Sequence, residues 1–277
     1  MMARFIWYSN ILVHSCHTLS LCGIFFSEII IIRRNTMIKV KRKILFGTVL
    51  FGCSLCAIGA FSKLGGGEGN GAVPVAIDYD EEKPVIVLDA GHGGMDGGCS
   101  TADGVPEKGI NLNILLTLRD MLKISGYDVI VTRDTDTSIH DKGIEGIANQ
   151  KSSDMDNRLE IFNQYSDAIC ISIHQNQFTD PKYSGAQMFY SDSNSENERL
   201  ARTLQSNFVE NLQPENEREI KLCGKELFLC YFSKNPTVMV ECGFLSNPQE
   251  AELLKTEEYQ RKVAFTIFSG INEFVSE

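Results

Sequence analysis

Short apolar runs alternate with amphipathic segments from residue 84 onward, and this alternation restricts the fold more than any other feature. Six short, mostly apolar runs have the length of strands, at 84–88, 127–133, 168–173, 185–190, 227–231 and 237–240. Four longer segments have the spacing of amphipathic helices, at 110–124, 156–165, 196–212 and 257–274. Strands that alternate with helices favour a parallel sheet, and continuously apolar strands are typical of sheets covered on both faces.

The sequence therefore predicts an α/β fold formed by a single domain over residues 84–277. We expect a twisted, mostly parallel central sheet of about six strands, flanked by helices on both faces. Ligands of such sheets bind at the carboxyl ends of the strands. His92 follows the first apolar run, His174 the third and Glu241 the sixth. These three side chains should meet at one edge.

Two histidines and a nearby acid at one edge suit a metal ion. A lone histidine at a strand end is more often a hydrogen-bonded structural residue, but two of them with Glu107 and Glu241 match a catalytic zinc site, which needs three N or O ligands and one open position. Glu107 comes just before the first predicted helix, so its alternative role is an acid stabilised by the helix dipole. Glu241 suits a general base, or else an acid that orients a histidine.

The segments around these residues resemble the zinc-dependent N-acetylmuramoyl-L-alanine amidases over roughly residues 84–275. They read Val-Ile-Val-Leu-Asp-Ala-Gly-His92-Gly-Gly, Glu107-Lys, Ser-Ile-His174-Gln-Asn and Val-Glu241-Cys-Gly-Phe-Leu-Ser-Asn. The resemblance implies that His92, Glu107 and His174 bind Zn2+ and that Glu241 is the catalytic acid/base. It also implies that the substrate is peptidoglycan and that the broken bond is the amide between N-acetylmuramic acid and L-alanine.

The short His174-Gln-Asn-Gln variant, without wall-binding repeats, resembles the germination-specific spore-cortex branch of this family. That branch implies cleavage of spore-cortex peptidoglycan as a step towards the muramic-δ-lactam needed for germination. It also implies a functional link to a muramic acid N-deacetylase and an accessory spore-envelope protein. Two alternatives stay open at this point: another zinc peptidase or deacylase of the cell wall, and a catalytically silent partner-binding module.

The N-terminal part of the chain differs from the predicted domain in charge. Residues 1–73 carry a net charge of +6, whereas the remainder carries −16 and lacks the clustered Lys and Arg that nucleic acids require. We therefore expect no nucleic-acid partner.

Basic residues after Met37 precede an apolar run, which predicts a signal peptide or N-terminal membrane anchor over 37–61. A glycine-rich linker follows over 62–83. We expect the domain to be exported across the cytoplasmic membrane, secreted or membrane-anchored, and to act in the forespore envelope and cortex space. Residues 1–36 fit no such plan, and we interpret them as a mis-assigned upstream extension with Met37 as the start.

Overall fold

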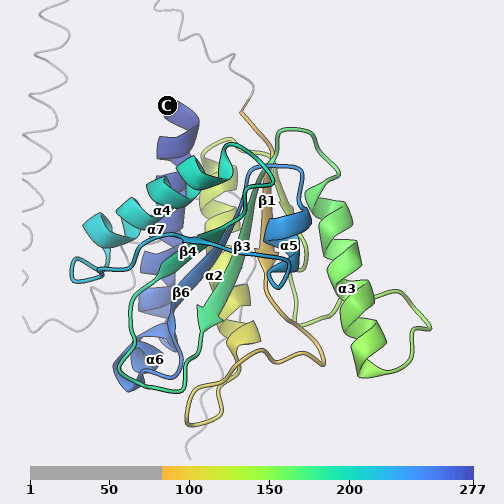
Figure 1. Ribbon diagram of the computed structural model, residues 1–277, viewed down its shortest axis with the longest axis horizontal. Coiled ribbons are helices and arrows are strands. Elements are labelled where there is room, and N and C mark those ends of the chain that lie inside the picture. The colour runs from red at the N-terminus through yellow and green to blue at the C-terminus, as the bar shows by residue number, and fades with distance from the viewer. Residues whose placement is uncertain (1–82) are drawn as a thin grey trace, which may run out of the picture. The chain divides into compact units, whose positions relative to one another are not determined.

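The computed structural model describes residues 83–277, which form a six-stranded sheet between two layers of helices (Figure 1). The predictions for residues 1–36 and 37–61, and for the linker before Lys83, lie outside this described part. The strands are β1 (Ile86–Ala90), β2 (Val129–Val131), β3 (Ile169–Asn176), β4 (Gln187–Tyr190), β5 (Lys221–Leu222) and β6 (Thr237–Phe244).

The strand order is β2-β1-β3-β6-β4-β5. The first four of these strands are parallel, whereas β4 pairs antiparallel with β6 and parallel with β5. The predicted α/β fold with a mostly parallel sheet of six strands is thus confirmed. Because β1, β3 and β6 point the same way, their carboxyl ends share one edge, the lower edge in Figure 1.

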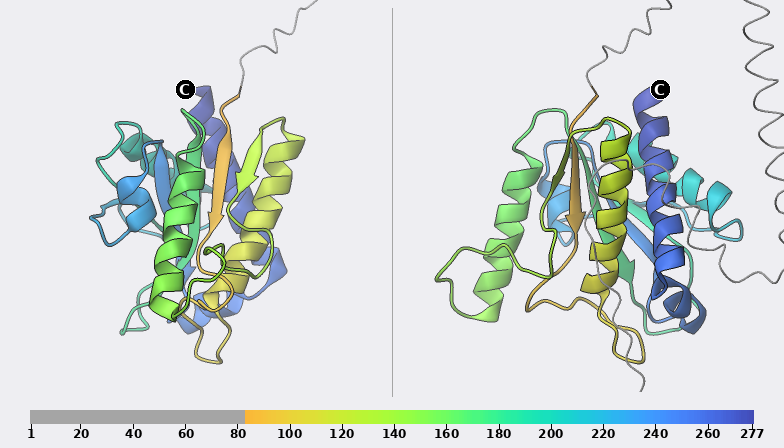
Figure 2. Two further views of the ribbon diagram at one scale, coloured as in Figure 1. Left: turned by 90° about the vertical axis from the view of Figure 1, so that its right-hand side faces the viewer. Right: turned by 180° about the vertical axis from the view of Figure 1, so that it is seen from behind.

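Helices cover both faces of the sheet, as predicted. They are α2 (Glu107–Ile124), α3 (Ile147–Phe162), α4 (Asn197–Asn211), α5 (Phe228–Phe232), α6 (Pro248–Leu254) and α7 (Glu257–Ser276). Helices α2, α4 and α7 pack together on one face, and α3 and α5 lie on the other (Figure 2). Within the described part of the chain, no helix is both long and apolar enough to cross a membrane.

Helix α2 shows how the sequence pattern produces the core. Its buried residues recur at helical spacing and pack against the apolar side chains of β1 and β3, as Ile110, Ile114, Leu118 and Leu122 do. Gly126 adopts a positive φ of 83° just past the helix, a conformation that favours glycine and ends the helical hydrogen bonding. This packing fixes the start of α2, and therefore Glu107, against the edge of the sheet.

One strand prediction is wrong. Residues 227–231 were expected as a strand, but they belong largely to helix α5, and β5 takes the edge of the sheet. A short apolar run without alternation does not distinguish a strand from a buried helical turn. Here the run packs on the α3 side of the sheet, where Leu229 and Cys230 are buried and Phe232 is exposed.

Other boundaries also differ from the prediction. Helix α3 begins at Ile147, nine residues before the predicted start at 156, and α6 was not predicted at all. Strands β3 and β6 run past their predicted ends, so that His174 and Glu241 lie within the strands instead of after them. The two residues are register partners on neighbouring strands, which sets their side chains on the same face of the sheet.

Candidate active site

The loop after β1 brings His92 onto the end of β3. His92 has a positive φ of 64°, a conformation that a non-glycine residue adopts at some energetic cost and often at functional sites. The chain can approach β3 this closely because the preceding residue is glycine: a Cβ on Gly91 would lie 2.1 Å from the His174 ring. The two imidazole rings consequently stand 5.0 Å apart between centroids, edge to face.

Glu107, the first residue of α2, lies between the two histidines and is almost fully buried, with 2% of its surface exposed. Its Oε1 is 3.0 Å from His174 Nδ1 and accepts a hydrogen bond from the backbone N–H of Gln175. Its Oε2 is 3.3 Å from His92 Nε2 and accepts one from the backbone N–H of Cys99. Burial alone would raise the pKa of Glu107, but the contacts with His174 and His92 hold it well below its usual range.

The predicted ligand residues therefore come together in space. One ligand atom from each of His92, Glu107 and His174 lies within 4.8 Å of the others. Asp96 Oδ2 is 2.9 Å from His92 Nδ1, and a carboxylate in that position orients the ring so that Nε2 faces Glu107. Two imidazoles and one carboxylate form the donor set that catalytic zinc prefers, so these residues fit a zinc ion.

Hydrogen bonding around His92 also bears on metal binding. Burial opposes a charge on this ring, but the hydrogen bonds with Glu107 and Asp96 outweigh that effect and raise the pKa of His92 to about 9. Without a cation at the site, the His92 ring therefore carries a second proton at neutral pH and is positively charged. Metal ions bind neutral imidazole, so a cation has to displace this proton.

Glu241 stands beside this group but has no place in its hydrogen-bond network. Its Oε2 is buried and has no hydrogen-bond partner among residues 83–277. Buried polar atoms are nearly always paired, so this carboxylate oxygen is free to accept a hydrogen bond from a group outside the chain. Burial raises the pKa of Glu241 to about 7, with Glu107 adding to the effect and His174 and His92 partly offsetting it. Such a value suits a general acid/base near neutral pH.

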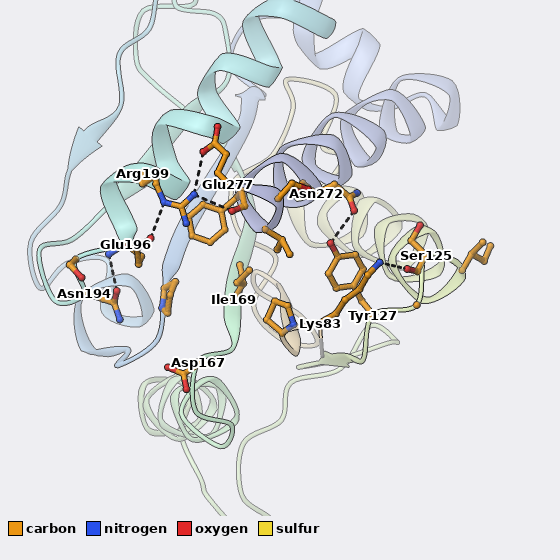
Figure 3. A pocket seen from close by; sticks show the side chains of 18 residues that line it. Lys83, Ser125, Tyr127, Asp167, Ile169, Asn194, Glu196, Arg199, Asn272 and Glu277 are labelled. Atoms are coloured by element: carbon orange, nitrogen blue, oxygen red, sulfur yellow. Dashed lines mark hydrogen bonds and ion pairs between the residues drawn. The ribbon is translucent and has the colours of Figure 1, made fainter. Parts of the chain in front are cut away.

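A cavity of about 390 Å³ opens onto these side chains from the α3 and α5 side of the sheet. His92, His174 and Glu241 line one wall, and the segment 226–229 lines another. A larger cavity, of about 1370 Å³, lies at the opposite edge of the sheet, where Arg199 pairs with Glu196 and Glu277 (Figure 3). Its lining contains no histidine, so the smaller cavity is the candidate active site.

Two buried arginines hold the loop that carries His92. Arg158 of α3 donates hydrogen bonds to the carbonyl oxygens of Ala90 and His92, at 2.9 and 2.7 Å, and pairs with the buried carboxylate of Asp89. Arg133 donates to the carbonyl oxygens of Ala90 and Gly91, at 2.9 and 3.0 Å. The backbone of the loop is thus fixed at three consecutive carbonyl groups, which preorganises the position of the His92 ring.

Sequence reasoning missed several residues that support the site. Asn111 donates to Glu107 Oε1 from one helical turn away, and its place within the apolar face of α2 was a signal. Asp96 and Arg133 carried no comparable signal, because a loop acid and an arginine after a strand are common on surfaces. His140 lies outside the group, with its Nδ1 2.9 Å from Ser138 Oγ.

Fold and site together define a class: an α/β protein with two histidines and two glutamates gathered at the carboxyl edge of a parallel sheet. The chain belongs to the N-acetylmuramoyl-L-alanine amidases, whose family model matches residues 86–273. It is therefore a member of a family of cell-wall hydrolases, as the sequence motifs predicted.

Individual relatives agree with this assignment. The chain is 37% identical over 193 residues to the germination-specific N-acetylmuramoyl-L-alanine amidase of Bacillus subtilis, covering 70% of this chain and 80% of that protein. The CwlD amidase of Clostridioides difficile, solved in complex with the GerS lipoprotein, matches with a TM-score of 0.68 and 37% identity over 70% of this chain and 99% of that one. The amidase AmiC2 of Nostoc punctiforme matches with a TM-score of 0.60 and 26% identity, over 70% of this chain and 98% of that one.

Proposed function

We propose that this amidase hydrolyses the amide between the lactyl group of N-acetylmuramic acid and L-alanine in spore-cortex peptidoglycan, with zinc held by His92, Glu107 and His174. The observation that carries the proposal is the unpartnered, buried oxygen of Glu241 beside that three-residue group. The likeness to a germination-specific amidase supports the cortex as the site of action.

In such sites, bound zinc polarises a carbonyl oxygen and lowers the pKa of water. The residues of the chain supply the rest of the chemistry. Glu241 accepts a proton from the attacking water and returns it to the amine of L-alanine as the amide bond breaks. Burial raises the pKa of Glu241, which helps this residue to hold the proton between the two transfers. Asp96 and the two buried arginines keep His92 in place while this happens.

The product of this reaction can be converted to the muramic-δ-lactam of spore cortex. Hydrolysis frees the lactyl carboxylate, and a δ-lactam forms when that carboxyl group condenses with the ring amine, which an N-deacetylase has to expose. We therefore propose a muramic acid N-deacetylase as the enzyme that acts next. An accessory spore-envelope protein is a further proposed partner, supported by the complex of CwlD with the GerS lipoprotein. Export to the forespore envelope completes the proposal and rests on the sequence of residues 37–61.

Metal removal tests the proposal. Dialysis of the purified enzyme against a chelator should abolish the release of peptides from peptidoglycan, and stoichiometric zinc should restore it. Elemental analysis of the restored enzyme should find about one zinc per chain, the usual content of a catalytic site. Full activity in a chelated enzyme shown to be free of metal would contradict the proposed role of zinc.

A further inference from the structure

The face of the sheet that carries Glu241 continues across β4 to Arg218. Gln187 of β4 is the direct antiparallel partner of Glu241, so the two side chains point to the same face. Gln187 Oε1 accepts a hydrogen bond from Arg218 Nη1 at 2.9 Å. Because neighbouring strands are about 4.8 Å apart, Arg218 lies on the order of 10 Å from Glu241.

Arg218 is held in one orientation. Its Nε donates to the carbonyl oxygen of Ser184 at 2.7 Å, and its guanidinium carbon lies 4.4 Å from the centroid of the Phe244 ring and 5.8 Å from that of Tyr183. These contacts fix the plane of the guanidinium group. Its Nη2 donates no hydrogen bond to any residue that the structure describes, so a pair of N–H donors remains free for a ligand.

Arg218 also forms no ion pair with a residue that the structure describes. Arg158, Arg199 and Arg202 each have a carboxylate oxygen within 4.0 Å, whereas Arg218 has none among residues 83–277. The nearby carboxylate of Glu250 accepts hydrogen bonds from the backbone N–H groups of Gly185 and Phe244. A half-buried guanidinium with free donors and no ion pair is well suited to a carboxylate ligand, which arginine binds through charge-assisted hydrogen bonds.

We propose that Arg218 binds a carboxylate of the stem peptide, on the residue that follows L-alanine, and so selects substrates in which this group is free. The proposal rests on the amidase function proposed above. An extended peptide spans about 3.3–3.6 Å per residue, so a carboxylate two residues beyond the scissile amide lies roughly 7 Å from it. A hydrogen bond of about 3 Å then reaches a guanidinium group at the distance of Arg218. The exposed rings of Phe178 and Tyr183, in edge-to-face contact, provide an apolar wall beside this position.

Two peptidoglycan fragments test the proposal: disaccharide tripeptides that differ only in whether the second residue carries a free α-carboxylate or a carboxamide. The wild-type enzyme should cleave the carboxylate form with a kcat/KM about 10- to 100-fold higher, the size expected of a charge-assisted hydrogen bond. Arg218→Ala should reduce this ratio to near one, and Arg218→Lys should retain part of it. Arg261→Ala, which changes an exposed arginine on α7, is the matched control and should leave the ratio unchanged.

The ratio compares two substrates on one enzyme preparation, so it does not depend on how much of a variant folds. An unchanged preference in Arg218→Ala, or equal cleavage of both fragments by the wild-type enzyme, would overturn the carboxylate site and leave the amidase function intact. Failure of the wild-type enzyme to cleave either fragment at the lactyl amide would instead contradict the function on which the proposal rests.

Discussion

Glu241→Gln is expected to retain zinc and to lose about 10²–10⁴-fold in turnover of peptidoglycan, the usual contribution of general acid–base catalysis. Gln matches Glu in shape but cannot accept a proton from water and return it to the amine. Because Glu241 stands outside the hydrogen-bond network of His92, Glu107 and His174, its replacement should not disturb those residues. The measurement pairs elemental analysis of zinc with the rate of peptide release.

The matched comparison is Glu107→Gln, which replaces a charged oxygen donor with a neutral one and should weaken metal retention. Zinc lost from Glu241→Gln but kept in Glu107→Gln would reverse the two roles, and an active Glu241→Gln enzyme would remove this residue from the mechanism.

The rate should also depend on pH through Glu241. The carboxylate form accepts the proton, so activity should fall as pH drops below the pKa of Glu241. Without a cation, burial raises the pKa of Glu241 to about 7. A cation at the site would favour the ionised carboxylate, so the loss of activity should then occur at a lower pH.

His92→Ala and His174→Ala should each lose zinc, and with it nearly all amidase activity. Each substitution removes one of three protein ligands, and at either position alanine also removes one of the two imidazole partners of the buried Glu107 carboxylate. His140→Ala is the control, because this histidine belongs to the loop before α3 and contacts Ser138 instead of the candidate ligands. Zinc content after dialysis separates the three variants. A loss in His140→Ala equal to that in His92→Ala would show that the ligand assignment is wrong.

The architecture could be predicted because its signals are periodic. Residues of α2 such as Ile114 and Leu118 repeat at helical spacing, and β1 and β3 each begin with a largely apolar run, so both kinds of element could be identified from the chain alone. The segment that became α5 carried no such signal. Five consecutive apolar residues satisfy a strand and a buried helical turn equally, and only packing on the α3 side of the sheet decides between them.

The sequence likewise predicts one part of the candidate site and not the other. His92, His174 and Glu241 could be placed at one edge because parallel strands end together, and Glu107 because it comes before a helix. The contacts that position these side chains could not be predicted. The hydrogen bonds from Arg133 to the carbonyl oxygens of the His92 loop join residues about 40 positions apart, and nothing in the local sequence indicates such tertiary contacts.

Digestion of peptidoglycan in water enriched in oxygen-18 tests the central claim most directly, because hydrolysis transfers an oxygen atom from water to the acyl side of the broken bond. The account predicts that mass spectrometry will find the label in the lactyl carboxylate of muramic acid, and that each released peptide will begin with an unlabelled L-alanine that has a free amine. Label in a carboxylate of the stem peptide, with L-alanine still attached to muramic acid, would show a peptidase and contradict the account.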